Sequence, residues 1–156
     1  MQKAAEAYYQ WQMADTPACL KAVTDGLDIA QTSGVHILDA ELLAQGAYGA
    51  LTAGDCETAQ DFLKRMFAVL DHNRLSDVIH YHFVSSWAAL LQGDVARAAQ
   101  HAETAVSMEI GMPIPRAENY CALAHVRHEQ QDEEQANACL ARTREIGRQT
   151  NSAPFR

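Results

Sequence analysis

A turn signal recurs along this chain at nearly equal intervals. It is marked by four aspartates, spaced 40, 39 and 38 residues apart: Asp15, Asp55, Asp94 and Asp132. Glycine precedes the two central aspartates, whereas Ala14 and Gln131 precede the outer two. A fixed period of about 20 to 50 residues is the signature of a repeat protein, in which each repeat is one supersecondary unit. The spacing therefore predicts four repeats, and the two central turns carry the stronger signal.

Small and apolar residues surround each of these turns. The residues eight positions before the aspartate are all small: Ala7, Ala47, Ser86 and Ala124. Those four positions after it are small again: Cys19, Ala59, Ala98 and Ala136. Those eight positions after it are apolar: Val23, Leu63, Ala102 and Leu140. Small residues let two antiparallel helices approach closely at a short turn. Glycine permits the left-handed backbone that ends the first helix, and aspartate caps the second.

The turns divide the chain into helix pairs. We expect the first helices near residues 3–13, 37–53, 75–92 and 114–130, and the second near 16–32, 56–72, 95–110 and 133–149. Gly46 and Gly49 interrupt one of these helices, and we expect them to permit close contact between helices. The predicted fold is all-α, a right-handed α-solenoid of about four antiparallel helix pairs. It forms one domain over 1–156, with repeats near 1–34, 35–73, 74–112 and 113–150 and a tail over 151–156.

The chain is acidic, with 12 Lys and Arg against 20 Asp and Glu and a formal charge of −8. Nucleic acid binding needs a basic face, so we expect none through this segment. There is no uninterrupted apolar stretch of about 18 residues, so no membrane span is expected. The N-terminal residues have no apolar signal core, which favours a cytoplasmic location. There is no C-x-x-C motif and no secretory context, so we expect no disulfides and free structural thiols at Cys19, Cys56, Cys121 and Cys139.

Helix pairs with Gly-Asp at the turn, a small residue eight before and alanine four after resemble tetratricopeptide repeats. The units of 38 to 40 residues are longer than the family's typical repeat of about 34. The stretches 34–41 and 50–55 are similar to the helical arrays of large transcription regulators of the MalT and LuxR type. The resemblance implies a place between a nucleotide-binding module and a DNA-binding helix-turn-helix. Neither module's motif occurs in this sequence, so we expect a sensor or interaction fragment of a larger regulator.

The resemblance also implies that the first helix of each pair lines a concave groove. Ring-bearing residues stand seven positions before each aspartate. Two further positions share this face: four before stand Trp11, Leu51, Leu90 and His128, and eleven before stand Ala4, Ala44, Phe83 and Cys121. The candidate binding residues on this face are Tyr8, Trp11, Tyr48, Leu51, Phe83, Trp87, His125 and His128. Rings along a groove can stack on sugars or aromatic ligands, or receive apolar peptide side chains. The alternative is that they pack between adjacent helices as core.

Three functions are open from the sequence. The favoured hypothesis is a regulatory module that binds a peptide or a neighbouring domain in the groove. The second is a sensor of a small-molecule inducer, such as a sugar or aromatic metabolite. The third is an enzyme with a metal at His125 and His128, which share a helix face with Glu129 nearby. No nucleophile elbow, dinucleotide loop or haem motif occurs, so we expect no catalytic residues, no metal and no cofactor.

Overall fold

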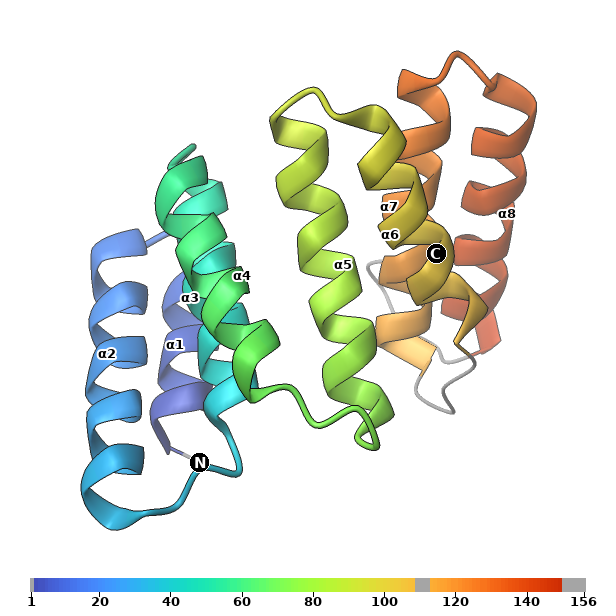
Figure 1. Cartoon of the computed structure of the whole chain (residues 1–156). Helices are drawn as coiled ribbons and strands as arrows, with labels where there is room; N and C mark the ends of the chain where they lie inside the picture. Colours follow the sequence, from blue (N-terminus) through green and yellow to red (C-terminus); the bar gives the residue numbers. More distant parts are fainter. Residues whose placement is uncertain (1, 109–112, 150–156) are drawn as a thin grey trace. The chain divides into compact units, whose positions relative to one another are not determined.

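The computed structural model describes residues 2–108 and 113–149, which form eight α-helices and no strand (Figure 1). In chain order these are α1 (Gln2–Gln12), α2 (Thr16–Ser33), α3 (Asp39–Thr52), α4 (Cys56–Val69), α5 (Leu75–Leu91), α6 (Val95–Ser107), α7 (Pro113–Glu129) and α8 (Glu133–Gln149). Within these ranges no helix is both long and apolar enough to cross a membrane. The all-α class and the sequential helix pairs are confirmed, whereas the right-handed solenoid stays a prediction.

The same backbone turn joins the two helices of every pair. The residue before each aspartate has a positive φ, of 57° to 76°: Ala14, Gly54, Gly93 and Gln131. In the third pair, the Gly93 N–H donates to the Leu90 carbonyl and the Asp94 N–H donates to the Ala89 carbonyl, both at 3.0 Å. These two bonds form a Schellman turn, which pairs the last carbonyl groups of the first helix.

Each turn aspartate also starts the second helix of its pair. Its side chain accepts a hydrogen bond of 3.0 to 3.1 Å from the N–H three residues on, donated by Ala18, Thr58, Arg97 and Gln135. Its carbonyl accepts from the small residue four positions on, at 2.9 to 3.1 Å. All four predicted N-caps are therefore confirmed, including those of the two weaker outer turns.

Small residues lie where the paired helices come closest. The four residues eight positions before the aspartates are at most 3% exposed. In the third pair, the Ser86 hydroxyl donates to the Ala98 carbonyl across the two helices at 2.9 Å. The glycines of α3 serve neighbouring contacts: a Cβ on Gly46 would lie 2.7 to 2.8 Å from the Phe62 ring of α4. A Cβ on Gly49 would lie 3.2 Å from the Cys19 sulfur, so the expected close contacts are confirmed.

Two second helices end three residues earlier than expected. Helix α4 ends at Val69 rather than at 72, because Leu70 is extended and the Asp71 side chain accepts from the Asn73 N–H at 2.9 Å. That local bond competes with continuation of the helix. Helix α6 ends at Ser107 rather than at 110, and Met108 is extended. Residues 109–112 lie outside the described residues, and the remaining helix ends agree with expectation to within two residues.

The chain divides into two compact units, Met1–Asp77 and Val78–Arg156, and the division falls in the first turn of α5. In the first unit α2 packs against α1 and α3, and α3 also packs against α1 and α4. In the second unit α7 packs against α6 and α8, over a core that includes Ala98, Ala102, Leu123 and Val126. All four cysteines are free, as expected, and burial raises the pKa of the Cys19 thiol to about 11.

The close crossing of α5 and α6 predicts a position-specific effect on stability. Ala98→Leu adds bulk at a fully buried position beside Ser86 and should lower the free energy of unfolding by about 1–3 kcal/mol. Ala96→Leu makes the same change at an exposed position of the same helix and should be close to neutral. Urea denaturation followed by circular dichroism measures both. Equal effects of the two variants would contradict the crossing.

The left-handed turns predict that removing a glycine lowers stability and that adding one raises it. Nothing lies within 4 Å of a Cβ added to Gly93, so Gly93→Ala introduces only the strain of a positive φ and should cost about 1 kcal/mol. Gln131→Gly relieves the same strain at φ 62° and should raise the melting temperature by a smaller amount, since glycine also loosens the unfolded chain. Calorimetry of the two variants checks the prediction. A stabilising Gly93→Ala would rule out this turn geometry.

Candidate functional site

The second unit has an open groove of about 480 Å³ between α5 and α7. One helix face from each lines it: Phe83, Ser86, Trp87 and Leu90 from α5, and Glu118, Cys121, Ala122 and His125 from α7. Both sets follow the spacing i, i+3, i+4, i+7, which places each set on one side of its helix. Three predicted binding residues, Phe83, Trp87 and His125, therefore come together in this groove.

Helix α6 holds both walls of the groove in place. On one side, Ser86 of α5 donates to the Ala98 carbonyl. On the other, the buried Asn119 side chain of α7 donates to the Ala105 carbonyl at 3.4 Å. The turns set the direction of the walls, because Trp87 and His125 both stand seven positions before an aspartate that caps the following helix. The groove is thus built by the hairpin register.

The walls are apolar and aromatic, with one acid. Among the described residues that line the groove, Glu118 is the single carboxylate and there is no Lys or Arg. Its side chain reaches solvent, yet the surrounding side chains remove part of its hydration and raise its pKa. The positive form of His80, on α5, opposes that rise. Loss of water, with Glu118 adding a smaller effect, also raises the pKa of the Cys121 thiol.

The candidate histidines of α7 are exposed. His125 lies at the groove, whereas the His128 Nδ1 is 2.7 Å from a Glu133 oxygen at the start of α8. Within the described ranges no three His, Cys, Asp or Glu side chains are arranged to hold a metal ion. Among those residues, none is placed to serve as a third ligand beside His125 and His128.

In the first unit the predicted ring residues pack on one another. The Trp11 and Tyr48 rings stack with centroids 4.7 Å apart, and Tyr8 is tilted toward Trp11 at 5.8 Å. The Trp11 indole N–H donates to the Thr52 hydroxyl at 3.0 Å. Tyr48 and Leu51 are only 5% and 3% exposed, whereas Tyr8 is 49% exposed. These contacts agree with the alternative in which the ring residues pack between adjacent helices as part of the core.

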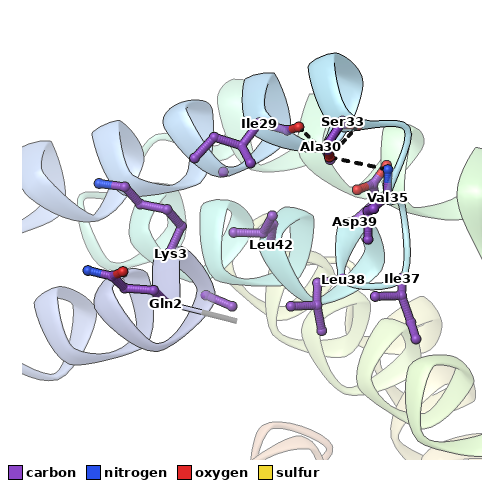
Figure 2. Close-up of a pocket in the computed structure, with 12 residues that line it drawn as sticks. Gln2, Lys3, Ile29, Ala30, Ser33, Val35, Ile37, Leu38, Asp39 and Leu42 are labelled. Atoms are coloured by element: carbon purple, nitrogen blue, oxygen red, sulfur yellow. Dashed lines mark hydrogen bonds between the residues drawn. The ribbon is translucent and has the colours of Figure 1, made fainter.

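A second hollow, of about 470 Å³, lies in the first unit among α1, α2, α3 and the loop before α3. Figure 2 shows Ile29 on α2, Leu42 on α3, and Val35 and Ile37 on the loop around it. Ile29, Val35 and Ile37 are 56% to 61% exposed, so the rim is unusually apolar for a loop. The expected helix bounds placed Ile37 inside the next helix, whereas the structure places it in the loop before α3.

The sequence hypotheses missed several groove residues. Leu90 stands four positions before Asp94 and Cys121 eleven before Asp132, on the face expected to line the groove, but neither was among the candidate binding residues. Glu118 lies fourteen positions before Asp132, one turn further along the same face. Extending the same helix face by one turn finds it. The chain matches no model of a known protein family, and no curated protein matches its sequence. The described residues define an array of helical hairpins with an open groove in the second unit.

A pair of histidines joins α5 to α6 in the second unit. The Nδ1 atoms of His82 and His101 are 2.9 Å apart, and Tyr81 meets both rings edge-on. One ring must donate and the other accept, so the contact exists only while at least one of the two is neutral. Burial lowers the pKa of both side chains, and His82 and Arg97 lower that of His101 further.

This pair predicts a loss of stability in acid. The folded-state pKa values lie below the unfolded value of about 6.5, so the unfolded chain binds protons first as pH falls. Stability present above about pH 6.5 should therefore decline between about pH 7.5 and about pH 5.5. Urea unfolding at both values measures the decline, which should be smaller in His101→Gln than in the wild type. The exposed His72→Gln is the matched control. An unchanged decline in His101→Gln would contradict the assignment.

Proposed function

We propose that this chain is a non-catalytic interaction module that binds a peptide segment in the groove between α5 and α7. The segment belongs to a partner protein or to another domain of the parent chain. The observation that supports this most is the groove itself, in which two helix faces stand opposite each other and remain open to solvent. Such a groove suits the apolar face of an amphipathic segment.

The half-buried rings give the groove its binding anchor. Phe83 and Trp87 lie on the same wall and keep part of their surface accessible. Large aromatic side chains contribute much apolar area and dominate the binding energy of many interfaces. Polar groups at the groove edge, Glu118 and His125, would then orient the segment. The α5–α7 groove is thus a better candidate than the packed rings of the first unit.

The proposal extends to the type of repeat and to the parent protein. We propose tetratricopeptide-type repeats in a signalling or transcription regulator of the MalT and LuxR type. Support comes from four equivalent turns, each with a left-handed residue and a capping aspartate. It comes also from the small residues at every helix crossing.

The second candidate is a small-molecule sensor that uses the same groove. Its volume of about 480 Å³ favours this reading, because ligand pockets commonly measure about 300–1,000 Å³. A sugar or aromatic metabolite would stack on Trp87. A thermal-shift screen of such compounds separates the two proposals, since a ligand at about 100 times its Kd adds about 2.7 kcal/mol of stability.

The peptide proposal is tested by removing the anchor ring. Peptides selected from a random library on the wild-type chain should bind Trp87→Ala at least about tenfold more weakly, because the ring's buried contact area is lost. Leu91→Ala, at an exposed position outside the groove lining, should bind normally. Fluorescence anisotropy gives the affinities, and circular dichroism checks the fold.

A second variant distinguishes binding at the groove from a purely structural role of Trp87. Ala122→Phe keeps the ring and fills the groove from α7, so it should weaken binding as well. Normal binding by both groove variants would refute the proposed site.

A further inference from the structure

Glu118 gives the groove a chemical preference. We infer that the occupant is a basic amphipathic peptide segment, which places an Arg or Lys stem against Phe83 and Trp87 and its cationic head at Glu118. This inference rests on the proposed function and specifies the chemistry of the partner. The Glu118 carboxylate would select among peptides by their charge, whereas apolar walls alone would not.

The position of Glu118 follows from the shared register of α5 and α7. Glu118 and Cys121 stand fourteen and eleven positions before Asp132, as His80 and Phe83 stand before Asp94. Glu118 lines the groove near enough to His80, on α5, for the charge of His80 to lower its pKa. The acid and the aromatic wall therefore share one groove, with Phe83 and Trp87 following along the helix.

Basic side chains fit this combination of groups. Arg and Lys lay their aliphatic stems on apolar surfaces while their charged ends stay near solvent. A guanidinium or ammonium group is attracted to the faces of aromatic rings and pairs with a carboxylate. Glu118 offers such a partner because it is partly dehydrated yet still reaches solvent.

Acidic partners fit poorly. The described lining contains no Lys or Arg that would hold a terminal carboxylate or a phosphate. The formal charge of −8 also repels anions at long range and attracts cations. Charge complementarity of this kind sets partner choice and association rate. A phosphopeptide or an acidic C-terminus is therefore disfavoured at this groove.

The test is a selection followed by a charge-deletion series. Random peptides of about 16 residues, long enough for about four helical turns, are displayed on phage, selected on the wild-type chain and counter-selected on Trp87→Ala. The recovered peptides should be enriched in Arg or Lys next to Leu, Phe or Trp. Glu118→Gln should raise their Kd about two- to fivefold, as expected for loss of a charge pair at an exposed side chain.

Two controls isolate the carboxylate. Glu134→Gln removes the same charge from the exposed first turn of α8, outside the groove lining, and should leave Kd unchanged. A peptide with its Arg replaced by Met should lose affinity for the wild type but not lose more with Glu118→Gln, which completes a double-mutant cycle. Glu118→Lys should prefer a peptide in which Glu replaces that Arg.

The outcomes separate this inference from the proposed function. Peptides that depend on Trp87 but are neutral or acidic, or that bind Glu118→Gln as well as Glu134→Gln, would overturn the basic partner and leave the groove as a peptide site. Failure to recover any peptide that depends on Trp87 would overturn the proposed function and the inference with it. Basic peptides weakened specifically by Glu118→Gln support both.

Discussion

Each hairpin depends on one aspartate that serves two helices at once. Its N–H closes the Schellman turn of the first helix, and its side chain caps the second. Because the turn fixes where both helices stop and start, every residue counted from the aspartate points in a set direction. Small residues eight positions before it therefore meet the neighbouring helix, as Ser86 meets Ala98. In the second unit the residues seven and eleven positions before it line the groove between α5 and α7 instead.

The same register gives different surfaces in the two units. In the first unit Trp11 stacks on Tyr48 and donates to Thr52, so large side chains of α1 and α3 fill the space between these two helices. In the second unit Leu90 and the exposed His125 stand at the positions equivalent to Trp11 and Tyr48, and a groove remains. Whether a helix face closes or stays open is thus decided by side-chain size at equivalent positions, with the backbone turn unchanged.

The hairpins could be predicted from the sequence because their cause is local. A capping aspartate, a left-handed residue before it and small residues at fixed distances are all visible along the chain, and even the atypical Ala14 and Gln131 turns obey them. The end of α4 could not be placed, because an Asp71 side-chain bond outcompeted a helix-forming pattern. Whether the ring residues pack on one another or line a groove could not be predicted either. Stacking of Trp11 on Tyr48 depends on the distance between helices that are about one repeat apart in sequence.

The central claim is that the turn register places a binding surface on the faces of α5 and α7 that line the groove. The most direct measurement is an NMR titration of the ¹³C-methyl and ¹⁵N-amide labelled chain with a selected peptide. The account predicts that the largest shift changes fall on residues 83–90 and 118–125, with intermolecular contacts to Trp87 and Ala122. Changes concentrated on α6 and α8, with Trp87 and Ala122 unaffected, would contradict it.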